Sequence, residues 1–263
     1  MNLAVDGRRV FAYTAGRRID PAQPSVVFVH GAGLDHSWFA LQSRYFAYHG
    51  RNAIALDLPG HGHSEGPPLR AIEAMADWLV RVLDGCGIGA ASIVGHSMGA
   101  LVALECAARH APRVERIALI GVAVPMAVSD AFLEAAKNDE PSAFDMETIW
   151  GHAAQVPLGG NPNPGMWMYG DMLARLERLA PGVLYSDLKA CSDYRSGLEC
   201  AKKVTCPALL VLGRRDVMTP PKSAAPLAQA LAGSRTLQVG TSGHSLMAEA
   251  PDAVLDALIE FLA

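Results

Sequence analysis

Short apolar runs alternate with segments of helical spacing along most of the chain, and this alternation constrains the fold more than any other feature. The runs are rich in β-branched residues and have the length of buried strands. They lie at residues 25–30, 52–57, 91–96, 114–120, 208–213 and 235–239. The helical segments lie at 38–49, 71–83, 97–110, 223–231 and 251–262. Strands separated by helices form parallel sheets with right-handed crossovers, so we expect an α/β fold with helices on both faces of the sheet.

The start of the chain and one long interval depart from this alternation. Residues 3–5 and 9–13 flank Asp6-Gly7 and predict a β-hairpin at the sheet edge. Between Ile120 and Pro207 the helical segments follow one another, at 130–138, 142–155, 164–179 and 185–191. The length of 263 residues fits one domain with an insertion. We therefore predict a core of residues 1–121 and 204–263 and a helical cap of residues 122–203.

Charge and cysteine content argue against several classes of partner. The formal net charge is -4 and the basic residues are scattered, which does not favour nucleic-acid binding. The N-terminus has no basic leader followed by an apolar stretch, and no apolar run has transmembrane length, so we expect a cytoplasmic protein without membrane contact. The five cysteines include no CxxC pair, and we expect them to be reduced and structural.

The pentapeptide Gly95-His96-Ser97-Met98-Gly99 lies where a predicted strand turns directly into a predicted helix. Such a turn strains the backbone at its corner, and the two glycines provide the room that it needs. The serine hydroxyl is then held in the open, and the amide of Met98 lies at the first turn of the helix, where it can stabilise an oxyanion. Ser97 is thus a candidate nucleophile, although the pattern alone is equally compatible with an ordinary helix N-cap.

A serine needs a base and a group that orients the base, and two loops at predicted strand ends provide candidates. His244 follows the last predicted strand, and Asp216 follows the strand at 208–213. Ligands of open α/β sheets bind at this carboxyl edge. Asp216 has an alternative interpretation as a turn or N-cap residue. The order Ser97, Asp216, His244 along the chain favours the catalytic interpretation.

The loop after the strand at 25–30 is the candidate source of a second oxyanion donor. It reads His30-Gly31-Ala32-Gly33, and we expect the amide of Ala32, or as second choice that of Gly33, to point at the same place as that of Met98. We expect His30 to hold this loop by hydrogen bonds. Aromatic and methionine residues of the cap either form its own core or line an apolar pocket facing Ser97. The candidate substrate contacts are His30, Gly31, Gly33, His96, Trp150, Trp167 and Met218.

Together these motifs resemble the α/β-hydrolase superfamily, in the subgroup with a helical cap between the sixth and seventh strands. The motifs are residues 30–33, 57–64 (Asp57-Leu58-Pro59-Gly60-His61-Gly62-His63-Ser64), 95–99, and 213–216 with 243–244. The resemblance implies an eight-stranded, mostly parallel sheet whose second strand is antiparallel. It also implies Ser97 as nucleophile, Asp216 as acid and His244 as base. The cap matches only by position and helical character, so the resemblance assigns no substrate.

The sequence favours hydrolysis of a small to medium, largely apolar carboxylic ester through an acyl-enzyme, with the ester as the expected partner. The alternatives are hydrolysis of a carbon–carbon bond, thioester or amide by the same triad, or a hydrolase-like binding protein with little turnover. A diketone hydrolase would need fixed cations, for which Arg195, Lys202 and Lys203 are candidates. His61 and His63 invite a metal interpretation, but no further ligands complete a site, so we expect no metal and no cofactor. The sequence does not indicate an oligomeric state.

Overall fold

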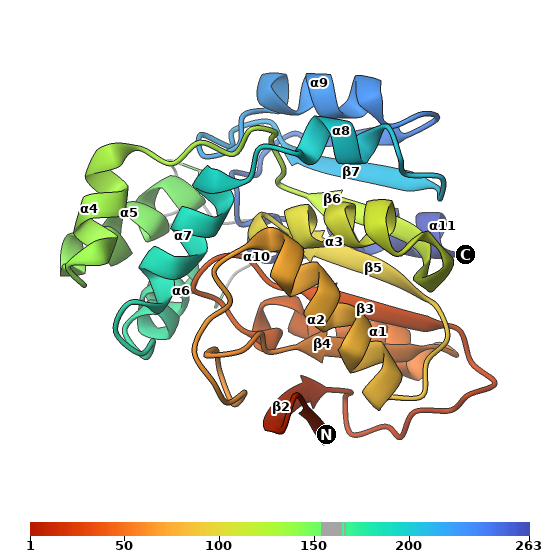
Figure 1. Cartoon of the computed structure of the whole chain (residues 1–263). Coiled ribbons are helices and arrows are strands. Elements are labelled where there is room, and N and C mark those ends of the chain that lie inside the picture. The colour runs from red at the N-terminus through yellow and green to blue at the C-terminus, as the bar shows by residue number, and fades with distance from the viewer. Residues whose placement is uncertain (154–164, 166) are drawn as a thin grey trace.

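The computed structural model describes residues 1–153, 165 and 167–263, and it forms one eight-stranded sheet (Figure 1). The strand order is β1-β2-β4-β3-β5-β6-β7-β8. The strands are β1 (Asn2–Val5), β2 (Arg8–Tyr13), β3 (Ser25–Val29), β4 (Asn52–Leu56), β5 (Ala91–His96), β6 (Val114–Ile120), β7 (Ala208–Gly213) and β8 (Arg235–Val239). The predicted hairpin is present as β1 and β2, and β2 is antiparallel to both of its neighbours. All other pairs are parallel, which confirms the expected fold class.

Two layers of helices cover the sheet, as the alternation predicted. The helices that alternate with strands are α1 (Ala40–Tyr48), α2 (Ile72–Gly85), α3 (Met98–Arg109) and α9 (Pro221–Ala230), and α11 (Pro251–Leu262) follows the last strand. In Figure 1, α2 and α3 lie in front of the sheet, whereas α1 and α11, which contact each other, lie behind it. Strands β3 to β7 are therefore buried on both faces, apart from two residues near the start of β6.

Strand β8 departs from the expectation of a buried strand. Four of its five residues are exposed, and only Val239 is buried. The reason is its place at the end of the strand order, where it has a strand neighbour only in β7 and less cover from helices. Its apolar content was therefore a sound indication of a strand but a poor one of burial.

The interval between β6 and β7 is helical, as predicted. It contains α4 (Asp130–Lys137), α5 (Pro141–Gly151), α6 (Met168–Leu176), α7 (Val183–Asp193) and the short α8 (Gly197–Ala201), which the spacing did not predict. A second short helix missing from the prediction is α10 (Leu246–Glu249). The predicted helices 142–155 and 164–179 extend into residues 154–164 and 166, which lie outside the described part of the chain. No described helix is long and apolar enough to cross a membrane.

The insertion lies over the carboxyl edge of the sheet. Two of its contacts are with loops that follow strand ends: Gly33 N donates to Asp187 Oδ2 of α7 at 2.9 Å, and Ser245 N donates to the carbonyl of Gly151 in α5 at 2.8 Å. Helix α8, in contrast, packs against α3 and α9 on the face of the sheet. The division into core and cap stays a prediction. Helices α4 to α7 lie over the carboxyl ends of the strands (Figure 1).

Candidate active site

The turn between β5 and α3 has the sharp geometry that the glycines predicted. Ser97 has φ 53° and ψ -114°, a conformation that a residue with a side chain rarely adopts. A Cβ atom on Gly95 would lie 2.0 Å from the carbonyl oxygen of Gly99, and one on Gly99 would lie 2.2 Å from that of Val29. The turn can therefore be this tight only with glycine at both positions.

Asp216 and His244 are in contact at the carboxyl edge of the sheet. His244 Nδ1 lies 2.7 Å from Asp216 Oδ2, and both side chains are buried. Burial raises the pKa of Asp216, but His244 and the hydrogen bonds outweigh this effect and lower it to about 2. Burial likewise lowers the pKa of His244, but the Asp216 carboxylate outweighs it, so the net shift is upward. The ionised carboxylate accepts from Nδ1–H, which leaves Nε2 free to accept a proton.

Thr219 belongs to this cluster, although no motif in the sequence pointed to it. Its hydroxyl lies 2.7 Å from Asp216 Oδ2 and 3.1 Å from His244 Nδ1. Asp216 Oδ1 accepts from the backbone N–H groups of Met218 and Thr219, both at 2.8 Å. The turn interpretation of Asp216 therefore also holds, since one oxygen orders the loop while the other faces the histidine.

Ser97 and His244 line the same cavity, which has a volume of about 350 Å³. Most of its wall is apolar, with contributions from Met126, Phe132, Trp150, Leu188 and Met218. The hydroxyl of Ser97 lies 4.0 Å from Met126 Sδ. In the described part of the chain no hydrogen bond joins this hydroxyl to His244, and such catalytic bonds often tighten only when substrate is bound.

The two predicted oxyanion donors have free backbone N–H groups. Ala32 lines the cavity and Met98 begins α3, and neither amide has a hydrogen-bond partner among the described residues. Gly33, the second choice, is different because its N–H already donates to Asp187 at 2.9 Å. The geometry therefore favours Ala32 over Gly33.

The structure does not bring His96 and His30 to the cavity, where substrate contacts were predicted. His96 Nδ1 accepts from Trp38 Nε1 at 3.2 Å, and its Nε2 lies 3.0 Å from the carbonyl of His244, to which it donates. His30 Nε2 accepts from Leu58 N at 3.2 Å, and its Nδ1 donates to the carbonyl of Gly31 at 2.8 Å. Burial is the largest influence on the pKa of both rings. The pKa of His96 is lowered, and that of His30 falls to about 4. Both histidines therefore hold loops as neutral residues.

The remaining predicted contacts divide between the cavity and other surfaces. Trp150 and Met218 line the cavity. Trp167 is 75% exposed and borders a separate hollow, so it is not a contact of this cavity. Gly31 does not line the cavity either; a Cβ there would lie 2.9 Å from His96 Nδ1, so this glycine allows the loop to approach the β5–α3 turn.

One polar residue of the cavity, Glu147, was missed in the sequence. It lies on α5, is only 4% exposed and lines the cavity with Ser97 and His244. Its Oε2 has no hydrogen-bond partner within the described ranges. Burial raises its pKa to about 7. The available signal was spacing, since Ala143, Glu147 and Gly151 recur every fourth residue on the buried side of α5.

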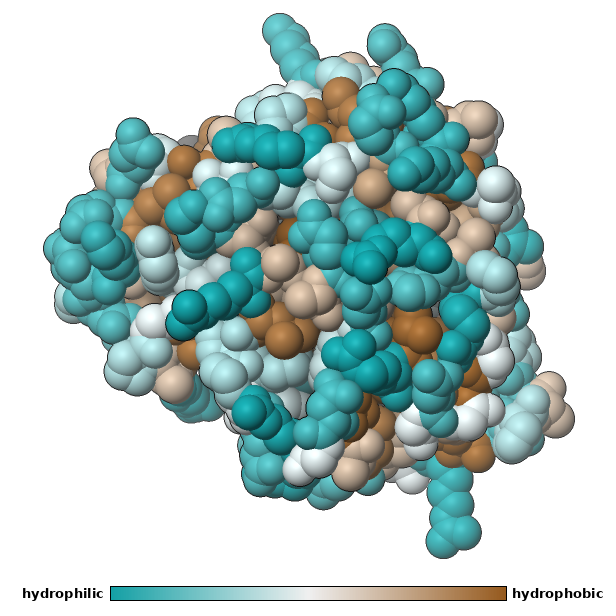
Figure 2. Space-filling model, in the orientation of Figure 1, coloured by the Kyte–Doolittle hydropathy of each residue, from teal (hydrophilic) through white to brown (hydrophobic). Residues whose placement is uncertain are grey.

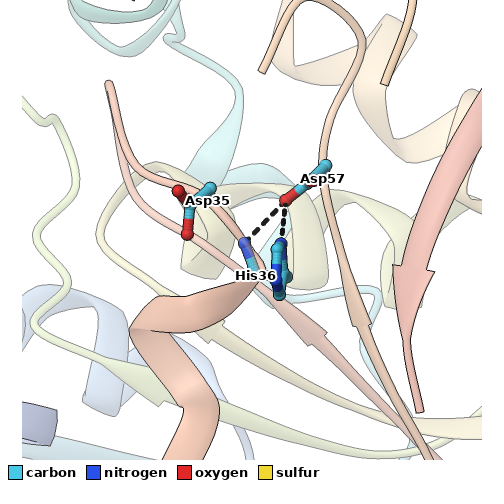
Figure 3. Close-up of side chains that lie close together, drawn as sticks. All are labelled: Asp35, His36 and Asp57. Atoms are coloured by element: carbon cyan, nitrogen blue, oxygen red, sulfur yellow. Dashed lines mark hydrogen bonds and ion pairs between the residues drawn. The ribbon is translucent and has the colours of Figure 1, made fainter. Parts of the chain in front are cut away.

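A possible metal-binding trio, Asp35, His36 and Asp57, has donor atoms within 4.8 Å of one another. Figure 3 shows Asp57 facing His36, whose backbone N–H and Nδ1 both lie 2.7 Å from Asp57 Oδ1. Asp57 Oδ2 accepts from His63 N, and Asp35 Oδ1 accepts from Ser37 N, both at 2.8 Å. These carboxylates already order the two loops, and a cation would have to replace those contacts. The expectation that the chain holds no metal stays a prediction.

The chain is similar in sequence and in fold to several known proteins. A profile described as "Alpha/beta hydrolase family" matches residues 26–257. The chain is 31% identical over 234 residues to the pimeloyl-[acyl-carrier protein] methyl ester esterase of Neisseria meningitidis serogroup C, covering 85% of this chain and 88% of that protein. The crystal structure of the enol-lactonase from Burkholderia xenovorans LB400 matches with a TM-score of 0.83 at 24% identity, covering 100% of this chain and 99% of that one. An esterase from Exiguobacterium antarcticum matches with a TM-score of 0.85 at 22% identity, covering 99% and 98%. The chain therefore belongs to the alpha/beta hydrolase family, the family that its motifs resemble.

Proposed function

We propose that the protein is a serine hydrolase that cleaves a small to medium carboxylic ester through an acyl-enzyme. The observation that most supports this is the 2.7 Å contact between His244 Nδ1 and Asp216 Oδ2 beside a cavity that also exposes Ser97. The esterase name of the relative from Neisseria meningitidis supports the carboxylic-ester class. The apolar wall of the cavity supports a substrate that is largely apolar.

In the proposed reaction Ser97 attacks the ester carbonyl while Nε2 of His244 takes the hydroxyl proton. Asp216 keeps the imidazole in the tautomer with hydrogen on Nδ1 and stabilises the imidazolium that forms. The amides of Ala32 and Met98 donate to the developing oxyanion, each contributing on the order of 3 kcal/mol in the transition state. The imidazolium then protonates the departing alcohol, and water repeats the sequence on the acyl-enzyme to release the acid.

The proposal is tested by labelling and by turnover. A fluorophosphonate should form one covalent adduct, on Ser97, and Ser97→Ala should abolish both the adduct and turnover of p-nitrophenyl esters. Thr241→Ala, which changes a hydroxyl residue of the loop before His244 that does not line the cavity, is the control and should keep both. Wild-type activity in Ser97→Ala would overturn the proposal, and so would a wild-type protein that neither forms the adduct nor turns over an ester.

The alternatives have less support from the cavity. Arg195, Lys202 and Lys203, which a carbon–carbon hydrolase would use to hold a carboxylate, are exposed and do not line it. Thioester and amide cleavage would use the same groups, and comparison of matched substrates separates them from ester cleavage. A receptor with little turnover would be favoured by a broad apolar surface, whereas the face in Figure 2 carries apolar residues in separate patches among hydrophilic ones.

We also propose a cytoplasmic location, as the cysteines suggested. All five are free in the structure, including the buried Cys106, Cys191 and Cys200. Proteins of reducing compartments typically keep their thiols in this form.

A further inference from the structure

The most unusual group in the cavity is the carboxyl group of Glu147. It lies on α5 and lines the cavity together with Phe132, Trp150 and Leu188. It is 4% exposed, and its Oε2 has no partner in the part of the chain that is described. A buried polar group without a hydrogen bond is costly, and an unpaired charge costs more. Buried polar groups in native proteins nearly always have a partner, so we expect a ligand in the cavity to provide one for this carboxyl group.

The charges around Glu147 indicate what that partner is. The groups that act on it electrostatically are His244 and Asp187, and it acts in turn on Cys191 of α7. Among the described residues that line the cavity, none is a lysine or arginine. Asp216 adds a second carboxylate directly behind His244. An anionic substrate group would therefore be repelled, whereas a cation would offset the charge and donate the missing hydrogen bond.

We propose that Glu147 is the binding site for a protonated amine of the substrate, so that the enzyme prefers esters that carry an ammonium group a few bonds from the carbonyl. This inference rests on the proposed esterase function and narrows its substrate class. The apolar wall would then enclose the carbon chain between the ester and the amine. A neutral hydroxyl is a weaker candidate because it would leave the carboxylate charge uncompensated.

The test compares esters that differ only in one atom. Dimethylaminoethyl butyrate and isopentyl butyrate have the same shape, but the first carries a protonated nitrogen in place of a CH group. Ethyl γ-(dimethylamino)butyrate and ethyl isoheptanoate form the same pair on the acyl side. We expect kcat/KM in at least one pair to favour the amine by about tenfold, as a charge-assisted hydrogen bond would provide. Equal rates within both pairs would overturn the inference.

The Glu147→Gln variant keeps the shape of the side chain and removes its charge. It should bring the amine-to-isostere ratio close to one while leaving the isostere itself a substrate. Asp145→Asn removes a charge from the exposed side of the same helix and should leave the ratio as in the wild type. A ratio that survives in Glu147→Gln assigns the preference to another group and contradicts the inference.

The pH dependence of the ratio gives an independent readout. Because burial raises the pKa of Glu147 to about 7, the carboxylate forms as pH rises through this value, and the preference for the amine should rise with it. Titration of His244 acts on both members of a pair and cancels in the ratio. A merely structural role of Glu147 would leave the ratio independent of pH.

Failure of the inference is distinguishable from failure of the proposed function. If the isosteres are hydrolysed and kcat/KM does not favour the amines, the result supports the proposed esterase function and contradicts the amine site. If no ester is hydrolysed, calorimetry with the butyramides of the two amines, dimethylaminoethylamine and isopentylamine, measures the same preference as binding. Equal affinity of the two amides would then overturn the amine site as well.

Discussion

At Gly121 the backbone lies directly against the ring of His244. This residue has φ +58°, and a Cβ atom on it would lie 3.1 Å from both Cε1 and Nδ1 of the imidazole. Contacts this short are tighter than nine in ten real Cβ contacts, so the ring would have to move by a few tenths of an ångström. The position of the imidazole thus depends both on its contact with Asp216 and on the absence of a side chain at Gly121.

Gly121→Ala should therefore reduce activity more than stability. We expect kcat/KM for a p-nitrophenyl ester to fall by about tenfold, because small displacements of a catalytic group are costly. The left-handed backbone should also cost about 1 kcal/mol of unfolding free energy. Gly233→Ala is the matched control, since Gly233 has φ +70° and a Cβ atom on it would meet no described atom within 4 Å. Equal activity losses in the two variants would contradict the role of the ring contact.

The interaction of Asp216 with His244 predicts the pH profile. Since the carboxylate shifts the pKa of His244 above its ordinary 6.5, kcat/KM should rise with pH and reach half its maximum above that value. In Asp216→Asn burial still lowers this pKa and only the charges of Glu147 and Glu249 still raise it, so the midpoint should fall relative to that of the wild type. The maximal rate should also fall by about 10⁴-fold, because the imidazole then prefers the wrong tautomer. An unchanged midpoint in the variant would exclude Asp216 as the partner of the base.

The sequence predicted those functional residues that come directly after the end of a strand. Ser97, Asp216 and His244 each follow a parallel strand, and parallel strands end at one edge of the sheet. Thr219 and Glu147 could not be found in this way. The first joins the cluster through the turn after Asp216, and the second reaches the cavity only because α5 folds back over the sheet.

Among the elements, α7 has the most specific attachment to the catalytic loops. Asp187 Oδ2 on this helix lies 2.8 Å from Nε2 of His61 and accepts from Gly33 N at 2.9 Å. All three groups are buried. Burial opposes a charge on His61, but Asp187 outweighs it and raises the pKa of the ring. One carboxylate thus joins the insertion to the loop of Ala32 and to the loop after β4.

Asp187→Asn should destabilise the fold, and more so at acid pH. Protonated His61 stabilises the folded state below its unfolded pKa of ~6.5, and this contribution is lost as pH rises through the higher folded value. We expect a loss of about 3 kcal/mol near pH ~6, from urea unfolding, and a smaller one near pH ~9. Asp193→Asn, which breaks only an exposed pair with Lys189 on the same helix, should cost under about 1 kcal/mol. A loss that is the same at both pH values would rule out this pairing.

The elements themselves were predictable to different degrees. Strands β3 to β7 were found because burial on both faces makes them continuous apolar runs. Helices α8 and α10 were missed because five and four residues are too few for a hydrophobic period. Their helical state depends on neighbours instead, as α8 packs against α3 and α9 and α10 packs against α11.

In the whole molecule the insertion and the sheet share one hydrophobic core. A single cluster of buried side chains includes Val94, Ile120 and Leu210 of the strands together with Phe132 and Leu188 of the insertion. Polar contacts also join the two parts. Glu105 of α3 accepts from the hydroxyl of Tyr194 at 2.6 Å, and Glu249 accepts from Ala153 N at 3.1 Å. Shared burial of this kind links the stability of the insertion to that of the sheet.

This shared core predicts that the insertion does not unfold on its own. Hydrogen exchange read by mass spectrometry should give the most protected amides of α7 and of β5 opening free energies within about 1 kcal/mol of each other. Asp187→Asn should lower both by the same amount, because the pair at α7 then stabilises the molecule as one unit. If the variant instead loses protection only in α4 to α7, the insertion is a separate cooperative unit. In that case the boundary between core and cap would have energetic as well as topological meaning. Movement of helices α4 to α7 away from the sheet would then be able to precede substrate entry.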